Sequence, residues 1–469
     1  MPVSPAREVA YRILRRVESG RAFAVELLQS AEVSNLKEVD RALVTELVMG
    51  VLRWRGELDF QIKRLLGRPL KRLDPEVATI LRLGIYQIRF LERIPKAAIV
   101  NEAVDMTKAA RKRSAAGLVN ALLRKFVPPT QRAAAGRIEE LAPETRESIE
   151  RAMPAWLFAR WAARDWARGP QAPEGGAEAA MKLAWASAQV PPATLRVGGA
   201  KADREGVQRE LAEEGIVTKP GRYASRALVV ESGNLQASKA LREGRVVIQD
   251  EASQLVAALV APKAGQRVLD LCAAPGIKAG QLAQALGSGT LVACDLSAPR
   301  LRTLAKLLPQ AAPSETRLLL VRLDATRGLP FGICFDRILL DVPCSGTGTL
   351  ARNPEIKWRL QPSDLTRFAE AQTKMLRNAL GLLAPGGRLI YATCSLEPEE
   401  NENVVERVLE EVPGYRLLTE AERSRDHPAL SPLFDSRGYF RTRPDLHRMD
   451  GFFAAVIVRD ESCPGQVWD

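Results

Sequence analysis

The sequence predicts a multidomain protein with an all-α N-terminal domain, a small α/β middle region and an α/β, Rossmann-like C-terminal domain. Three observations support this: the length of the chain, a helical apolar period near its start, and strand-like apolar runs alternating with helical stretches in its second half. With 469 residues the chain is too long for one core, since domains average about 150 residues. The predicted domains are residues 1–130, 131–235 and 236–469.

The N-terminal domain is expected to be helical from residue 6 to residue 126. Val9, Ile13, Leu14 and Val17 form one apolar stripe of a helix, and the same period returns at 42–52, 77–90 and 115–126. Residues 1–130 hold 24 Lys and Arg against 14 Asp and Glu, which is +10 of the net +12 of the chain. A basic excess in one domain indicates a polyanionic partner.

The middle region has weaker patterns. GPQAPEGGAE at 169–178 has the composition of a linker. After it, ATLRV (193–197) and RALVVE (226–231) predict short strands on either side of a helix-like stretch, DREGVQRELAEEG (203–215). These elements favour a small α/β unit.

A regular alternation of strand-like and helical segments begins at about residue 246. The apolar runs of strand length lie at 267–271, 290–295, 317–324, 335–341 and 387–394. Strands that alternate with helices predict a parallel sheet with helices on both faces. Ligands of such sheets bind outside the carboxyl ends of the strands, so the residues that end each run are the candidates for a site.

A nucleoside-binding site is predicted at these strand ends. The first run leads into DLCAAPGIKAGQLA, a turn of small residues opening a helix, where backbone N–H groups can approach a ligand. The next three runs end in Asp295, Asp324 and Asp341. No P-loop Gly-Lys-Ser/Thr is present, and the acidic rim suits a neutral or cationic nucleoside such as S-adenosylmethionine. Asp295 would then bind the ribose, Asp324 would lie by the adenine, and Asp341 near the sulfonium.

Two of the six cysteines end strand-like runs, Cys344 in LLDVPCSGTG and Cys394 in LIYATCSLEPEEN. There is no C-x-x-C pair and the chain has only two histidines, so no zinc site or other metal site is expected. A thiolate that adds to carbon 6 of a pyrimidine makes carbon 5 nucleophilic enough to take a sulfonium methyl group. Amino-group methylation needs no such nucleophile, so two thiols at strand ends indicate carbon methylation. The remaining cysteines (272, 294, 334 and 463) are expected to be small core residues.

Several of these stretches resemble a known family. DVPCSGTGTLARNPEIKW (341–358) and YATCSLEPEENENVV (391–405) resemble the paired signatures of RNA 5-methylcytosine methyltransferases. LDLCAAPGIKAGQLA resembles the S-adenosylmethionine loop of that family, and VIQDEASQLVA (247–257) the segment before it. The N-terminal helices resemble the RNA-binding fold of the antitermination factor NusB. This fusion is the arrangement of the RsmB/Sun/Fmu type of small-subunit (16S) rRNA cytosine-5 methyltransferases.

The resemblance implies roles for individual residues, including which thiol does what, a question that the chemistry alone leaves open. Cys394 is the implied nucleophile that attacks carbon 6, Cys344 assists product release, and Asp341 also belongs to the catalytic group. Small-subunit rRNA is the implied partner. The implied contacts of S-adenosylmethionine are Cys272, Ala273, Ala274, Pro275, Gly276, Ile277, Lys278, Asp295, Asp324 and Asp341.

The chain departs from the family pattern at three positions. Ile277 replaces the second Gly of the usual C-A-A-P-G-G-K-T loop and Ala279 replaces its Thr, while Gly198 stands in place of Asn in the middle region. If position 277 needs a positive φ, a β-branched residue there costs about 1 kcal/mol or more. Aromatic residues are scarce, so the candidates for stacking on the target base are few: Tyr391, Trp358 and Phe453, each of which could equally be a core residue.

Other interpretations remain open at this stage. The same chemistry could act on tRNA, or the chain could be a non-catalytic RNA-binding scaffold with a decayed cofactor pocket. Ile277 is the only support for a scaffold, whereas Asp341, Cys344 and Cys394 oppose it. No apolar run approaches the roughly 20 residues that cross a bilayer, and no signal peptide is recognisable, so a cytoplasmic protein without a membrane partner is expected. The oligomeric state is not predicted.

Overall fold

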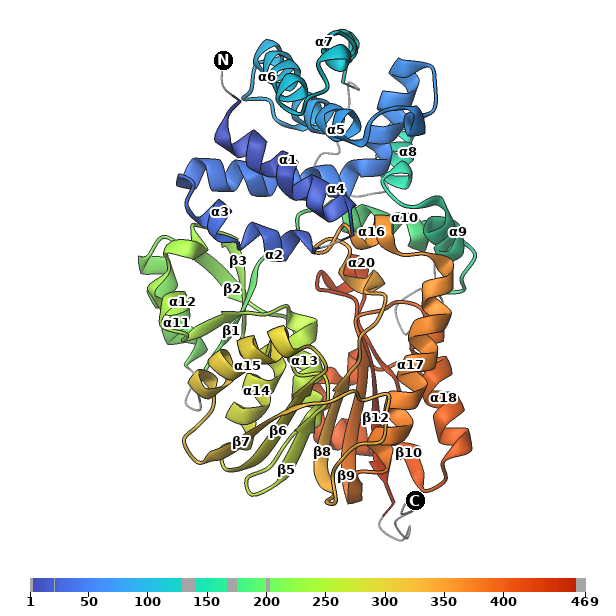
Figure 1. The fold of residues 1–469 in the computed structure, drawn as a ribbon. Coiled ribbons are helices and arrows are strands. Elements are labelled where there is room, and N and C mark those ends of the chain that lie inside the picture. Colours follow the sequence, from blue (N-terminus) through green and yellow to red (C-terminus); the bar gives the residue numbers. More distant parts are fainter. Residues whose placement is uncertain (1–2, 21, 129–140, 167–174, 200–202, 461–469) are drawn as a thin grey trace. The chain divides into compact units, whose positions relative to one another are not determined.

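The computed structural model describes residues 3–20, 22–128, 141–166, 175–199 and 203–460 (Figure 1). The chain forms two compact units. A helical unit comprises Met1–Trp166, Glu174–Val190 and the distant segment Leu350–Leu360. The second unit comprises Ala167–Pro173, Pro191–Thr349 and Gln361–Asp469, and it holds two sheets.

The helical unit confirms the expected all-α N-terminal domain. The stripe of Val9, Ile13, Leu14 and Val17 is buried, as its period predicts. The central helix is longer than its apolar core suggested, because charged first and last turns extend it to 29 residues. The N-terminal helices are α1 (Pro5–Glu18), α2 (Ala24–Leu28), α3 (Ala31–Ser34), α4 (Glu38–Leu66), α5 (Pro75–Phe90), α6 (Lys96–Ala109) and α7 (Ala116–Lys125).

Three further helices complete this part of the unit: α8 (Pro143–Arg151), α9 (Ala155–Ala162) and α10 (Gly176–Ala188). The predicted linker at 169–178 falls mostly outside the described residues. Its last residues are not a linker, since α10 begins at Gly176. The backbone of Gly176 packs against the carbonyls of Ala162 and Arg164, at 2.3 and 2.5 Å from where a Cβ would stand, so glycine is needed at this close approach.

The segment Leu350–Leu360 packs into the helical unit although it lies far along the chain, and α16 (Ile356–Arg359) is seen beside α10 (Figure 1). The buried Lys357 Nζ lies 3.4, 3.3 and 3.5 Å from the carbonyl oxygens of Arg53, Ala152 and Ser187. Burial lowers the pKa of Lys357 to about 7. Trp358 Nε1 donates to Leu52 O at 2.7 Å. One lysine and one tryptophan thus satisfy backbone carbonyls of three helix regions.

The smaller sheet of the second unit has the antiparallel order β2-β3-β1-β4. Both predicted strands and the helix between them are confirmed, with Leu195, Leu211 and Leu228 in the core. The strand at Val246–Ile248 pairs with β1, so the start of the predicted regular alternation belongs to this small sheet. The elements are β1 (Thr194–Val197), α11 (Arg204–Glu213), β2 (Val217–Pro220), β3 (Ala227–Ser232), α12 (Lys239–Arg242) and β4 (Val246–Ile248).

The larger sheet has the order β10-β12-β9-β8-β5-β6-β7, with β11 paired to β12. The five predicted strands form its parallel part: β5 (Arg267–Asp270), β6 (Gly289–Asp295), β7 (Thr316–Arg322), β8 (Phe335–Asp341) and β9 (Leu383–Thr393). The prediction of a parallel sheet was wrong at one edge. There β12 runs antiparallel to β9, and β10 runs antiparallel to β12. These edge strands are β10 (Tyr415–Leu417), β11 (Phe440–Arg441) and β12 (Phe453–Arg459).

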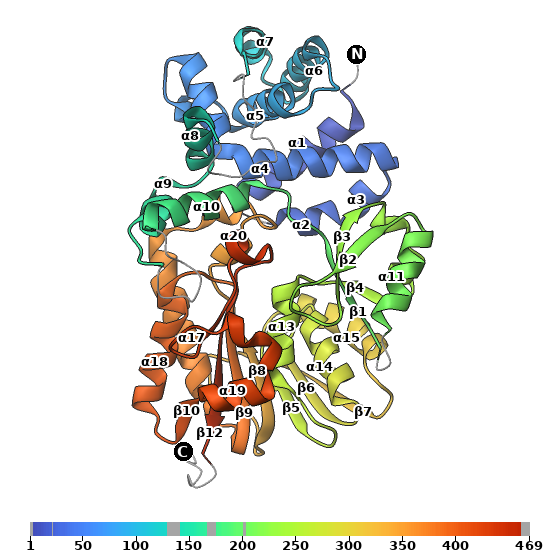
Figure 2. The same cartoon turned by 180° about the vertical axis from the view of Figure 1, so that it is seen from behind.

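Helices cover both faces of this sheet, as predicted. One core cluster joins it to α13 (Glu251–Val260), α14 (Ile277–Leu286) and α15 (Ala298–Ala311). A second core cluster, on the opposite face, joins the sheet to α17 (Pro362–Leu380) and α18 (Glu402–Glu411). Figure 2 shows the same fold turned by 180°. None of the helices in the described part of the chain is long and apolar enough to cross a membrane.

Candidate active site at the carboxyl ends of the large sheet

The turn between β5 and α14 forms the first part of the site. Gly276 has φ +114°, and a Cβ there would lie 2.5 Å from Leu304 Cδ1, so only glycine fits. Ile277 is the first residue of α14 and has no positive φ. The condition under which Ile277 would strain the loop, a positive φ at position 277, is therefore not met in this structure. The free N–H groups at the start of α14 give this end of the loop a partial positive charge.

Asp295 ends β6, as predicted, and binds the loop. Its Oδ2 accepts a hydrogen bond from the Ala274 N–H at 3.3 Å, and its Oδ1 accepts one from Ser297 N–H at 2.8 Å. Arg300 donates to the carbonyl of Ala274 at 2.5 Å. Each carboxylate oxygen can accept more than one hydrogen bond, so Asp295 orients the turn and keeps capacity for a ligand.

Asp324 does not end its strand, because β7 stops at Arg322. Its Oδ1 accepts hydrogen bonds from the backbone N–H of Thr326 at 3.0 Å and from the Thr326 hydroxyl at 2.7 Å. These bonds hold the pKa of Asp324 below its usual range. Asp324 is therefore an ionised, partly exposed group beyond the end of β7.

Asp341 ends β8 and pairs with the loop lysine: Lys278 Nζ lies 2.8 Å from Asp341 Oδ2. Burial alone would lower the pKa of Lys278, but the charge and hydrogen bond of Asp341 raise it. The ammonium also lies 5.3 Å from the centre of the Phe452 ring. The start of α14 and strand β8 are thus joined by an ion pair in which Lys278 keeps its charge.

Asp270, at the end of β5, is a fourth carboxyl that the sequence reasoning missed. It is fully buried, and neither oxygen has a hydrogen bond of good geometry within the described residues. Burial, with the negative charge of Asp341, raises its pKa to about 7. The signal was present, since Asp270 ends its strand as Asp295 and Asp341 end theirs.

The two thiols meet. Because β8 and β9 are adjacent and parallel, their carboxyl ends lie side by side, and the Sγ atoms of Cys344 and Cys394 are 3.3 Å apart. The contact with Cys394, together with burial, raises the pKa of Cys344 well above the usual range for a thiol. Cys344 is therefore protonated at neutral pH. Either sulfur can be the donor in this S–H···S contact.

The two cysteine loops are bound to each other. The N–H of Gly348 donates to the carbonyl of Cys394 at 2.9 Å, and the N–H of Leu396 donates to Thr347 Oγ1 at 2.9 Å. A buried carboxyl, Glu400, contacts Ser345 and Ser395, the residues that follow the two cysteines. Sequence reasoning missed Glu400, although PEEN stands close behind Cys394.

The remaining candidates include Cys272, which lies in the turn between β5 and α14. Cys294 is a core residue, as expected, while Cys272 and Cys334 are partly exposed and Cys463 lies outside the described residues. Tyr391 and Phe453 are also buried, and the Tyr391 hydroxyl donates to the carbonyl of Glu400 at 2.6 Å, so of the two roles considered for them the structure shows the core role. The indole N–H of Trp358 donates to the carbonyl of Leu52 within the helical unit.

The fold and the family models together define the class of protein: a methyltransferase domain fused to a NusB-like helical domain. Three family models match: the 16S rRNA methyltransferase RsmB/F model at residues 257–458, the NusB family at 4–128, and the ferredoxin-like domain of RsmF/B-like methyltransferases at 153–235. The chain belongs to the RsmB/F family of 16S rRNA methyltransferases, in its NusB-fused RsmB/Fmu form.

Curated relatives extend over nearly the whole chain. The ribosomal RNA small subunit methyltransferase B of Pseudomonas putida is 35% identical and covers 97% of this chain and 98% of its own length. A probable ribosomal RNA small subunit methyltransferase B of Bacillus subtilis is 33% identical with the same coverage. These matches confirm the resemblance to the RsmB/Sun/Fmu type.

Solved structures agree with the fold. The crystal structure of PH0851 has a TM-score of 0.74 at 23% identity, covering 97% of this chain and 99% of its own. A methyltransferase homolog from Pyrococcus horikoshii has a TM-score of 0.55 at 28% identity, covering 68% of this chain and 100% of its own. The predicted fold class is confirmed in all three parts.

Proposed function

We propose that the chain is an S-adenosylmethionine-dependent methyltransferase that makes 5-methylcytidine in small-subunit rRNA through a covalent cysteine adduct. The observation that carries this proposal is the 3.3 Å contact between Cys394 and Cys344, in which Cys344 keeps its proton. Methylation of an oxygen or an exocyclic nitrogen needs no thiol, whereas carbon 5 of cytosine must first be activated by a nucleophile at carbon 6.

The cofactor site fits S-adenosylmethionine. The helix N-terminus after Gly276 suits a carboxylate, and Asp295 suits the two ribose hydroxyls. Both oxygens of Asp270 are buried and have no hydrogen bond of good geometry within the described residues, which suits a donor such as an ammonium group. We assign cofactor contacts to Cys272, Ala273, Ala274, Pro275, Gly276, Ile277, Lys278, Asp295, Asp324 and Asp341. When bound, the cofactor supplies a methyl group on a positively charged sulfur.

The chain's own groups then act in sequence. The Cys394 thiolate forms an S–C bond with carbon 6 of the cytosine, and carbon 5, now an enamine carbon, takes the methyl group as the bond between that methyl and the cofactor sulfur breaks. The proton on carbon 5 passes to a solvent water, the S–C bond to carbon 6 breaks, and Cys394 departs as a thiolate with the 5,6 double bond restored. Cys344, still protonated and 3.3 Å away, stabilises that departing thiolate. Asp341 holds Lys278 as an ammonium at the rim.

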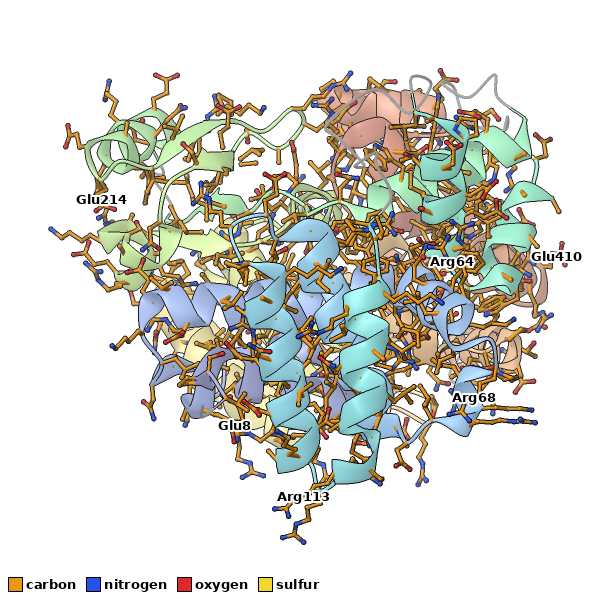
Figure 3. All side chains as sticks on the ribbon, turned by 90° about the horizontal axis from the view of Figure 1, so that it is seen from above. Glu8, Arg64, Arg68, Arg113, Glu214 and Glu410 are labelled. Carbon is orange, nitrogen blue, oxygen red and sulfur yellow. The ribbon has the colours of Figure 1, made fainter. Side chains whose placement is uncertain are left out.

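The helical domain is proposed to bind the RNA backbone, and the small sheet with residues 131–235 to assist it. Arg68 and Arg113 extend away from the ribbon (Figure 3), and neither forms an ion pair within the described residues. Small-subunit rRNA is the proposed substrate because it appears in the names of the curated relatives. The target cytidine must leave its stack to reach Cys394. A cytoplasmic location remains the prediction.

The test is methylation of unmodified small-subunit rRNA with S-adenosylmethionine, followed by mapping of 5-methylcytidine. We expect one modified cytidine, no product with Cys394→Ala, and an accumulating protein–RNA adduct with Cys344→Ala. Cys294→Ala, which changes a buried thiol of the core, serves as the control and should keep the activity. An active Cys394→Ala variant would contradict the mechanism.

Two other outcomes lead elsewhere. Methylation of tRNA but not of rRNA would move the substrate to tRNA and leave the thiol roles intact. Absence of saturable S-adenosylmethionine binding would support the non-catalytic scaffold. The scaffold has lost its one argument, because Ile277 occupies an ordinary helical position.

A further inference from the structure

The residues that follow the two active-site cysteines share one acceptor, the carboxyl group of Glu400. Its Oε1 accepts a hydrogen bond from the backbone N–H of Ser345 at 2.8 Å, and its Oε2 accepts one from the Ser395 hydroxyl at 2.6 Å. The Ser345 hydroxyl also donates to Oε2. Glu400 lies at the end of the short turn Pro398–Glu400, so one side chain contacts both loops.

Hydrogen bonds of this cluster reach both neighbours of Cys344 in the chain. Gln372, a fully buried residue of α17, donates from its Nε2 to Glu400 Oε1 at 3.1 Å and to the carbonyl of Pro343 at 3.0 Å. Pro343 and Ser345 flank Cys344, and both are therefore tied to the same polar cluster. Cys394 is held on one side, through Ser395.

This cluster differs from an ordinary structural ion pair. Glu400 is fully buried, and no Lys or Arg of the described residues forms an ion pair with it. Burial raises the pKa of Glu400, while the hydrogen bonds from Ser345, Ser395 and Gln372 act in the opposite direction. A buried carboxyl without a cation is costly unless neutral donors satisfy it. Here three of the four hydrogen bonds come from the two cysteine loops, and the fourth comes from Gln372 of α17.

We propose that Glu400 is a positioning residue that holds Cys344 and Cys394 at the separation the reaction requires. This inference rests on the proposed function for its catalytic consequence, since the two thiols must work in turn. A carboxylate suits the task because its oxygens accept all four hydrogen bonds at once, whereas an amide has a single acceptor oxygen. Glu400→Gln keeps the size of the side chain but replaces one acceptor oxygen by an amide group, so part of the hydrogen bonding to the two cysteine loops is lost.

The geometry can be tested without RNA or cofactor, by oxidation of the thiol pair with diamide. Two adjacent thiols give up two protons and two electrons to diamide, which becomes the hydrazine, and the sulfurs form a disulfide. The rate at which Cys344 becomes linked to Cys394 is measured by mass spectrometry after the remaining thiols are alkylated. Glu410→Gln, the same change at an exposed position of α18, is the matched control.

We expect wild type and Glu410→Gln to form the linkage at the same rate and Glu400→Gln to form it roughly tenfold more slowly, the factor expected for a lost hydrogen bond to a charged group. Circular dichroism first establishes that each variant is folded. Should Glu400→Gln fail to fold, Ser345→Ala/Ser395→Ala removes the hydroxyls and leaves the carboxyl in place, with the same slowing expected. An unchanged rate in a folded variant, or no linkage in wild type, overturns the proposal.

A second readout separates positioning from general stability. In the methylation assay Glu400→Gln should lower kcat while the KM values for RNA and S-adenosylmethionine stay within about twofold. A rise in KM with unchanged kcat would contradict positioning. If wild type links its thiols but methylates no RNA, the proposed function fails alone. If wild type methylates RNA and Glu400→Gln does so equally well, the positioning role fails alone.

Discussion

Lys278 and Asp341 connect the two halves of the candidate site: the ammonium of the loop lysine lies 2.8 Å from the carboxylate at the end of β8. Three residues after Asp341 the chain reaches Cys344. The ion pair therefore joins the segment proposed to bind the cofactor to the segment that carries a thiol. Its two charges are mostly shielded from water, with 18% and 23% of the side chains exposed.

Asp341→Asn should lower the methylation rate by about 100-fold or more, because it removes a preorganised charge at the reacting centre and leaves the Lys278 ammonium without its partner. The measurement is kcat on rRNA with saturating S-adenosylmethionine. Asp336→Asn changes the opposite end of the same strand, where the carboxylate accepts from the N–H of Arg267, and should stay within a few-fold of wild type. Equal losses in the two variants would contradict a local role for Asp341.

Ile277→Gly, which restores the usual family residue, should not tighten cofactor binding. Position 277 opens α14 in a helical conformation, so glycine there relieves no strain and lowers stability by about 0.5–1 kcal/mol. Calorimetric titration with S-adenosylmethionine and urea denaturation measure the two effects. Gly276→Ala is the contrasting change and should weaken binding, because its Cβ would meet Leu304. Markedly tighter binding by Ile277→Gly would mean that the loop changes shape when it is loaded.

The stability of the second unit should depend on His427 below neutral pH. Arg388 Nη1 lies 3.0 Å from His427 Nε2, so that nitrogen must accept and the ring must be neutral. Burial, with the charge of Arg388, lowers the pKa of His427 to about 4. The unfolded chain binds a proton near pH 6.5, so this contribution to stability is present above that pH and is lost as the pH falls toward 4.

Urea denaturation of wild type and His427→Gln at about pH 7 and about pH 5 tests this dependence. Glutamine can still accept from Arg388 but does not titrate. Wild type should lose up to about 1.4 kcal/mol more per pH unit than the variant over this range. Parallel pH profiles would show that His427 is not the titrating group.

RNA binding should depend on the free arginines of the helical unit more than on its paired ones. Arg68→Ala/Arg113→Ala should weaken RNA binding and reduce the slope of log K against log salt by about 1–2, since each phosphate contact contributes about 0.7–0.9. Arg12→Ala is the control: Arg12 is similarly exposed but forms ion pairs with Glu8 and Glu32. Filter binding at several salt concentrations gives both slopes. A larger effect from Arg12 would place the RNA elsewhere.

Four of the five strands that the sequence predicted in the large sheet share a physical property. β5, β6, β8 and β9 are buried in the centre of the sheet, and continuous apolar runs mark such strands clearly. β2, β4, β10 and β11 have two to four residues each, too few for a period to show. The antiparallel direction of β12 could not be foreseen, because side-chain alternation carries no information on which way a strand runs.

The residues of the site also fall into two groups: those that strand patterns predict and those that only the folded chain brings together. Asp295, Asp341 and the two cysteines were found because they follow buried strands, and adjacent parallel strands bring their ends together. Glu400 could not be found in this way, since its partner Ser345 lies 55 residues earlier and only the folded loops bring them together. The sequence left two roles open for Tyr391, and the structure shows the core role, which is the ordinary one for an aromatic residue inside an apolar strand.

The insertion of Leu350–Leu360 into the helical unit has a consequence for the order of events during synthesis. The ribosome must make 159 residues after Val190, from 191 to 349, before the segment that supplies Lys357 and Trp358 emerges. At about 5–20 residues per second this takes roughly 8–32 seconds. During that interval the carbonyls of Leu52, Arg53, Ala152 and Ser187 lack their final donors. The helical unit can therefore be completed only after residues 350–360 have been made. A fragment that ends at residue 190 lacks these donors.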